Sequence, residues 1–277
     1  MKKLIILLVL TTTNSFTQDL SSAMTFNVRY ATAKDGINQW ENRKKDVLNL
    51  LKNYSPDIVG FQEMLKSQLE FIDENLNKYH YVGVAREDGK SKGEFSPIFF
   101  NTKKYKIIEN GTFWLSKTPD VPSMGWDAAH KRVCTYVKLV NLKKNNFLWV
   151  FNTHFDHLGK EARINSSKLL ISQIEKLLDL DKEKIILMGD FNSLPNSEPI
   201  KIIMNKLEDG MMNSKNKFKG ELSTFNGFEV NKKNDGKRID YIFSKNLKID
   251  SYNHLYDKRQ NSLYVSDHFP VLISFKE

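Results

Sequence analysis

A strand that ends in an acid and an amide is the feature that most constrains this chain. Residues 185–193 read Ile-Ile-Leu-Met-Gly-Asp-Phe-Asn-Ser. The apolar run predicts a buried strand that ends at Gly189. In an extended backbone, Asp190 and Asn192 point the same way. A carboxylate beside an amide oxygen suits Mg²⁺, or the orientation of a water molecule on phosphorus. An ordinary strand followed by an Asp/Asn turn would explain the same residues.

The first part of the chain predicts a strand–helix–strand unit. Residues 23–29 and 57–63 alternate or run apolar as strands do, and residues 40–54 have helical spacing. A helical crossover makes the two strands parallel, so Asn27 and Glu63 would reach the same edge of the sheet. Glu63 could instead be a solvated acid that caps the following helix.

A second unit of the same kind leads into the opening stretch. Residues 148–157 predict an apolar strand with a polar end, and residues 161–180 predict an amphipathic helix. His154 follows the apolar residues directly and could donate to a phosphate oxygen or act as a general acid. His154 and His157 form an H-x-x-H pair, but no second motif supplies the further ligands that zinc needs.

The last strands carry three more candidates. Asp240 lies inside the apolar run 238–243, where a buried carboxylate needs a partner. Asp267 and His268 precede the final apolar strand. Adjacent strand residues face opposite sides, so both can serve one site only if the chain bends, and Pro270 favours such a bend.

The middle of the chain predicts short strands split by polar turns, in antiparallel pairs, over residues 79–151. A long loop at 116–132 lies between two of them. Trp114 and Arg132 are candidate substrate contacts, because arginine grips phosphate and tryptophan stacks on a base or sugar. Packing of the tryptophan beneath the loop is the alternative.

The N-terminus predicts a signal peptide over residues 1–17, cleaved near Thr17, and therefore a secreted or periplasmic protein. Its apolar run is too short to span a bilayer. The rest, 18–277, lacks a linker or repeat and predicts a single domain. The single Cys134 excludes an intramolecular disulfide framework. The net charge of +9 favours anionic partners, although the lysines are spread along the chain.

The candidate residues share one location, at or just past the ends of predicted strands. They are Asn27, Glu63, Asn152, His154, Asp190, Asn192, Asp240, Asp267 and His268. Carboxylates, amides and histidines without a cysteine cluster indicate Mg²⁺-dependent or Mn²⁺-dependent hydrolysis of phosphate esters.

Six segments resemble, in order, those of the endonuclease/exonuclease/phosphatase superfamily, which includes deoxyribonuclease I, apurinic endonucleases, inositol 5-phosphatases, neutral sphingomyelinases and the CCR4/nocturnin deadenylases. The segments are 25–29, 60–63, 152–154, 189–192, 239–241 and 266–270. Residues 113–116 and 125–129 further resemble a secreted bacterial branch near the CCR4/nocturnin side. The resemblance implies a deoxyribonuclease I-like α/β fold, a four-layer αββα sandwich of two mixed β-sheets flanked by helices.

The resemblance also implies a metal site. Glu63 would be the principal Mg²⁺ ligand, with Asn27 and Asp267 nearby. Arg29 departs from some nucleases of the superfamily, which carry an acid there. A two-metal scheme is therefore harder to transfer to this chain.

The remaining roles concern the water molecule and the phosphate. Asp190 would orient or deprotonate the attacking water, and Asn192 would hold the scissile phosphate. His154 and His268 would stabilise the charge that develops on the phosphorane, and Asp240 would fix the tautomer of His268.

We therefore expect a secreted, Mg²⁺-dependent phosphoesterase that cleaves phosphodiesters by in-line attack of water, with nucleic acid or a nucleotide as the leading substrate. A phosphatase or phosphodiesterase acting on a lipid or sugar phosphate, like a sphingomyelinase or inositol phosphatase, is the alternative. A catalytically inactive binding protein on the same scaffold would lack core residues, and none of them is missing. The sequence indicates no membrane span and no obligate protein partner.

Overall fold

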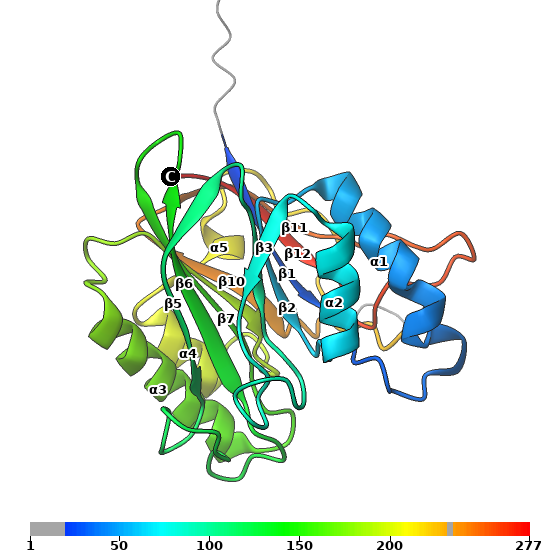
Figure 1. The fold of residues 1–277 in the computed structure, drawn as a ribbon, viewed down its shortest axis with the longest axis horizontal. Coiled ribbons are helices and arrows are strands. Elements are labelled where there is room, and N and C mark those ends of the chain that lie inside the picture. Colours follow the sequence, from blue (N-terminus) through cyan, green and yellow to red (C-terminus); the bar gives the residue numbers. More distant parts are fainter. Residues whose placement is uncertain (1–19, 232–234) are drawn as a thin grey trace, which may run out of the picture.

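Two β-sheets packed face to face form the centre of the protein (Figure 1), which a computed structural model describes over residues 20–231 and 235–277. The first sheet has the strand order β11-β12-β1-β2-β4-β3, and the second has the order β5-β6-β7-β8-β10-β9. Each contains one parallel pair, β1 with β2 and β7 with β8, as the two strand–helix–strand units predict. The predicted signal peptide lies outside the described residues.

Each sheet contains six strands. The first sheet contains β1 (Ser21–Asn27), β2 (Ile58–Gln62), β3 (Tyr79–Val82), β4 (Ile98–Asn101), β11 (Lys248–His254) and β12 (Val271–Lys276). The second contains β5 (Tyr105–Trp114), β6 (Val133–Asn141), β7 (Phe147–His154), β8 (Ile185–Asp190), β9 (Glu208–Asp209) and β10 (Asp240–Lys245).

Helices cover both outer faces of the sandwich (Figure 1). On the first sheet lie α1 (Trp40–Tyr54) and α2 (Lys66–Asn75), and on the second lie α3 (Lys160–Leu177) and α4 (Glu198–Met204). Two short helices, η1 (Gly36–Asn38) and α5 (Gly210–Asn213), complete the fold. The four layers confirm the predicted αββα architecture. No helix among the described residues is long and apolar enough to cross a membrane.

Three apolar cores hold the layers together. In β2, Ile58 packs between the sheets, whereas its neighbour Val59 packs beneath the helices. This follows from the two-residue period of a strand, which sends successive side chains to opposite faces. Because both faces of each sheet are covered, its central strands are apolar on both sides, as the run in β8 predicts.

Glycine allows β7 and β8 to approach closely just before the candidate residues. Gly189 has φ of +151°, and a Cβ atom there would lie 2.1 Å from the backbone oxygen of Thr153. A larger residue would push the two strands apart. The strand does not end at Gly189 as expected but continues through Asp190, which pairs with both β7 and β10.

Candidate active site

A cavity of about 480 Å³ opens at the edge of the sandwich where β1, β2, β7 and β8 all end. The structure brings most of the predicted site residues into its lining, namely Glu63, Arg132, His154, Asp190, Asn192, Asp267 and His268. Asn27 and Asp240 lie directly behind them, hydrogen-bonded to lining residues. We call these residues, except Arg132, the strand-end cluster.

Asn27 joins the two sheets within this cluster. Its Nδ2 atom donates to Glu63 Oε1 and to Asp190 Oδ2, at 3.0 Å each. Glu63 Oε2 accepts from the backbone N–H of Tyr30, 3.1 Å away. Glu63 is therefore a member of the site and is not the helix cap that the sequence left open.

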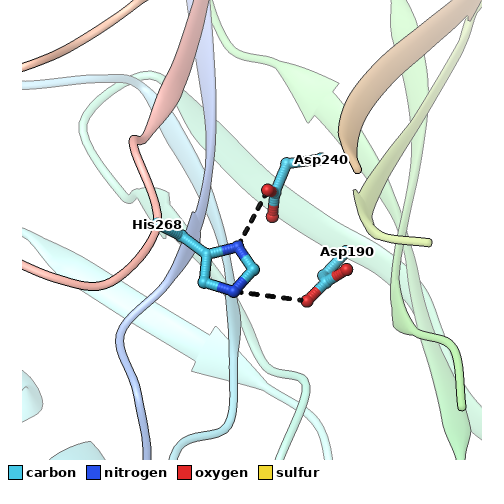
Figure 2. Close-up of side chains that lie close together, drawn as sticks. All are labelled: Asp190, Asp240 and His268. Carbon is cyan, nitrogen blue, oxygen red and sulfur yellow. Dashed lines mark hydrogen bonds and ion pairs between the residues drawn. The ribbon is translucent and has the colours of Figure 1, made fainter. Parts of the chain in front are cut away.

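His268 lies between two carboxylates (Figure 2). Its Nδ1 atom lies 2.9 Å from Asp240 Oδ2, and its Nε2 atom lies 3.8 Å from Asp190 Oδ2. Burial disfavours a charged ring, but the charge of Asp240 and its hydrogen bond raise the pKa of His268 well above its usual range. The ring is therefore oriented by Asp240, in the pairing that the resemblance implies, and its raised pKa favours the protonated form.

Asp190 is a buried carboxyl group with an unusual proton affinity. Burial, with repulsion from Asp240 added to it, raises the pKa of Asp190 to about 7. Its Oδ1 atom accepts from the backbone N–H of Asn192 at 2.9 Å. Asn192 has φ of +46°, so the backbone is not extended there, yet both side chains still line the same cavity. A carboxyl group that titrates near neutral pH suits a general base.

His154 is neutral, with a defined tautomer. Asn192 Nδ2 lies 3.2 Å from His154 Nε2, and an amide NH₂ group can only donate, so Nε2 accepts and Nδ1 carries the proton. That proton faces Glu94 Oε2, 3.8 Å from Nδ1. Burial and the positive charge of Arg132 hold the pKa of His154 well below its usual range.

A second group of side chains, which we call the loop cluster, lies beside the strand-end cluster, with Glu94 Oε2 3.8 Å from His154 Nδ1. Its members are Arg86, Glu94, His130, Arg132, Asp156 and His157. Oppositely charged members pair within it. Arg86 Nη1 donates to Glu94 Oε2 at 2.6 Å, and Arg132 Nε donates to Asp156 Oδ1 at 3.3 Å.

Trp114, a predicted substrate contact, and Asn152, which was predicted at the strand ends and as a further substrate-binding residue, lie away from the cavity. Trp114 is 5% exposed, and its indole N–H donates to the backbone oxygen of Arg86 at 2.7 Å, so it packs beneath the loops. Asn152 is fully buried between the sheets, where its amide bonds Gln62, Phe61 and Pro97. The structure therefore gives neither residue a substrate contact. Arg132 does line the cavity.

Sequence patterns did not identify several lining residues. They are Arg29, Tyr30, Glu94, His130, Phe225, Lys237 and Ile239, and His157 was noted only as half of a zinc motif. Arg132 Nη2 lies 3.2 Å from His157 Nδ1, and a guanidinium at that atom is incompatible with a metal on it. No local sequence pattern predicts Glu94 as a site residue, because its position depends on how a distant loop folds.

The oxygen donors of the strand-end cluster fit a hard divalent cation. Glu63, Asp190 and Asp267 all line one cavity, and burial together with repulsion from Glu63 raises the pKa of Asp267. Arg29 Nε, 3.7 Å from Asp267 Oδ2, offsets only part of this negative charge. Crowded carboxylates with an amide beside them are the donor set that Mg²⁺ prefers.

Asp190, Asp240 and His268 form a second group that could hold a metal ion, since each offers a ligand atom within 4.8 Å of the others (Figure 2). The Nδ1 atom of His268 is already committed to Asp240 at 2.9 Å. A metal ion bound at Nδ1 would have to displace the proton shared with Asp240. We therefore favour Glu63 and Asp267 as the ligands.

Comparison with known proteins finds a phosphatase and a probable exonuclease among the similar chains. It is similar to the mannosyl-6-phosphatase Bt3783 of Bacteroides thetaiotaomicron, with 34% identity, a TM-score of 0.87 and coverage of 93% of this chain and 100% of that one. It is 30% identical to protein L388 of Acanthamoeba polyphaga mimivirus over 89% of this chain and 96% of L388. It is 28% identical to the probable RNA exonuclease NGL3 of Saccharomyces cerevisiae, over 58% of this chain but 34% of NGL3.

The family follows from a match along most of the chain. The sequence model described as Endonuclease/Exonuclease/phosphatase family matches residues 24–268, which include the whole strand-end cluster. The resemblance seen in the six sequence segments is thus confirmed. Members of this family hydrolyse phosphate esters, and this chain belongs to the endonuclease/exonuclease/phosphatase family.

Proposed function

We propose that this protein hydrolyses phosphate esters by in-line attack of water. The observation that carries the proposal is the pairing of Asp190, whose pKa lies near 7, with the oriented ring of His268, whose pKa is raised, in one cavity. The first group can accept a proton at neutral pH and the second can stabilise negative charge. Water attack on phosphorus needs both.

Each residue of the site has a separate role in the proposed reaction. Asp190 holds the attacking water and accepts its proton. Asn192 donates to His154 Nε2 at 3.2 Å and to the backbone oxygen of Phe155 at 3.0 Å, so it fixes the His154 ring beside Asp190. His268 donates to an oxygen on which charge develops, while Asp240 keeps its ring in place through the bond of 2.9 Å. Each side chain is fixed by neighbours before the substrate arrives, so little reorganisation is needed.

Glu63 and Asp267, with Asn27 beside them, would hold Mg²⁺ or Mn²⁺, which would neutralise negative charge on the phosphate as the bond breaks. The crowded carboxylates described above support this assignment. Asn27 also ties the ligand Glu63 to the base Asp190. The metal site and the water site are therefore held at a fixed separation.

A phosphorylated sugar is the substrate class that we propose first. The similarity to a mannosyl-6-phosphatase covers nearly the whole of both chains. A compact polar pocket suits a terminal phosphate carried by a small polar group.

Cleavage of nucleic acid, as a nuclease or an exonuclease, is the second candidate. The similarity to a probable RNA exonuclease favours it, as does the net charge of +9. That similarity covers only part of this chain and a third of the yeast protein. We also propose that the protein is exported, because residues 1–17 have the pattern of a signal peptide.

A substrate panel tests the proposal. Protein starting at residue 18 would be incubated with phenyl phosphate, hexose 6-phosphates, bis(p-nitrophenyl) phosphate, RNA and DNA, each with Mg²⁺ or with EDTA. We expect Mg²⁺-dependent release of phosphate that is fastest from a hexose phosphate. Faster cleavage of RNA or DNA would replace the first candidate with the second. Failure to cleave any ester would contradict the reaction itself.

A further inference from the structure

We propose that Glu94 and His157 form a subsite that recognises hydroxyl groups on the leaving group of the substrate. This inference rests on the proposed function, because it concerns the group that departs from phosphorus. Both residues line the same cavity as the strand-end cluster. A phosphate at the strand ends and a hydroxylated leaving group at the loops would therefore share one continuous space.

The proton on His157 is fixed by its neighbour. Arg132 Nη2 lies 3.2 Å from His157 Nδ1, and a guanidinium nitrogen can only donate. Nδ1 must therefore accept, and the proton of the neutral ring sits on Nε2. Burial and the charge of Arg132 lower the pKa of His157, which keeps the ring neutral. His157 thus offers one N–H donor of known position.

The ring of His157 is also held in place. It stacks on the ring of His130, with centroids 5.8 Å apart and planes inclined by 18°. Asp156, next to it in the chain, accepts from the backbone N–H groups of Leu158 and Gly159 at 3.1 and 2.8 Å. A donor supported in this way can select a partner by position.

Glu94 supplies an acceptor with a free oxygen. Arg86 Nη1, Arg132 Nη1 and His154 Nδ1 all face its Oε2 atom, at 2.6, 4.0 and 3.8 Å. Among the described residues no donor is assigned to its Oε1 atom, although the side chain lines the cavity and is 16% exposed. A carboxylate oxygen accepts from a hydroxyl group and repels a phosphate. Glu94 therefore suits the uncharged part of the substrate.

Arg132 holds His157 in place. It is 4% exposed, and its Nε and Nη2 atoms are bonded to Asp156 and His157. In this subsite Arg132 is thus a positioning residue. An acceptor from Glu94 and a donor from His157 match the paired donor and acceptor character of hydroxyl groups. A sugar-like leaving group meets both requirements, whereas a plain aromatic ring meets neither.

The test compares two substrates in two proteins. Phenyl phosphate reports the strand-end cluster alone, and the preferred hexose 6-phosphate reports both clusters of the cavity. In His157→Phe we expect kcat/KM for the hexose phosphate to fall about three- to tenfold, mainly through KM, because one hydrogen bond is lost. The value for phenyl phosphate should stay within about twofold. His157→Gln can accept from Arg132 and still donate, so it should recover part of the loss.

His80→Phe is the matched control, because His80 is exposed on β3 and does not line the cavity. It should leave both substrates unchanged. Equal loss of both substrates in His157→Phe, or no loss of either, would overturn the subsite. A wild-type enzyme that cleaves phenyl phosphate but shows no preference for a hydroxylated ester would overturn it too, with the proposed reaction intact. Loss of hydrolysis of every ester would remove both proposals.

Discussion

The two clusters of the cavity are built on opposite electrostatic principles. In the loop cluster, Arg86 and Arg132 are paired with Glu94 and Asp156, so buried charges cancel within the group. In the strand-end cluster, carboxylates outnumber the cations beside them, and the pKa of Asp190 rises to about 7 in consequence of burial and of Asp240. A balanced group holds its shape, whereas an unbalanced one attracts a cation and exchanges protons.

This contrast separates two kinds of contribution. Substitutions in the strand-end cluster should reduce the reaction rate. They should leave the stability of the fold unchanged or increase it, because the neighbouring carboxylates repel one another. Changes in the loop cluster should reduce stability and selectivity, because its charges support one another. The following experiments test that division, and each could contradict it.

The largest effect is expected from Asp190→Asn. The variant keeps the shape of the side chain but cannot accept a proton, so hydrolysis should fall by about 10²- to 10⁴-fold. Initial rates with saturating Mg²⁺ measure this. Because the variant also removes a conflicting charge, its melting temperature should not decrease. Retention of full activity would remove Asp190 from the reaction.

Arg132→Met should lower the free energy of unfolding. Arg132 is 4% exposed, and its loss leaves the buried carboxylate of Asp156 without its charged partner, at a cost of about 3 kcal/mol. Urea denaturation measures this difference. Lys206→Met is the control, since its pair with Glu175, 2.8 Å apart, is exposed and should contribute little. Equal stability of Arg132→Met and the wild type would contradict the role assigned to the loop cluster.

Mg²⁺ should distinguish the two clusters without any measurement of activity. At a Mg²⁺ concentration of about 100 times Kd, binding should stabilise the folded protein by about 2.7 kcal/mol. Glu63→Gln should reduce this stabilisation sharply, whereas Glu94→Gln should retain it. Thermal unfolding with Mg²⁺ and with EDTA measures both. If only Glu94→Gln lost the stabilisation by Mg²⁺, the metal would bind at the loop cluster instead.

The smallest effect concerns pH. The carboxyl group of Asp190 has a pKa of about 7 in the folded protein against 3.8 when unperturbed. Over that interval the folded state binds more protons than the unfolded state, so this residue's contribution to stability falls as the pH rises. In EDTA, Asp190→Asn should match the wild type near pH 4 and exceed it by at least about 1 kcal/mol near pH 8. A constant difference would mean that Asp190 does not titrate in this range.

The strand-end cluster could be predicted from the sequence, whereas the loop cluster could not. Asn27, Glu63, His154 and Asp190 stand at strand ends that apolar periodicity marks, and parallel pairing brings strand ends to one edge. The two strand–helix–strand units follow from the same periodicity, whereas the arrangement of the strands in two packed sheets was predicted from the family resemblance. The strand β11, by contrast, is not evident from its sequence, because polar residues interrupt its alternation.

The loop cluster could not be predicted, because its geometry depends on contacts between distant loops. Glu94 reaches the cavity only because its loop is held by Trp114, through the bond to Arg86, and by Lys131, which donates to the backbone oxygen of Glu87 at 2.8 Å. No local pattern encodes these contacts. The burial of Trp114 has the same cause, since an indole that fastens a loop from below cannot also face a ligand.

Asn152 holds one sheet in a fixed position relative to the other. Its amide, bonded to Gln62 Nε2 at 2.6 Å and to the backbone oxygen of Phe61 at 2.7 Å, fastens β7 to β2 across the sandwich. Gly60 leaves room for it, since a Cβ atom there would lie 2.7 Å from the Asn152 amide. One sheet carries Glu63 and the other carries Asp190. Asn152 therefore fixes the two sheets relative to each other, and any sliding of one sheet over the other would misplace Glu63, the proposed metal ligand, relative to Asp190, the proposed base.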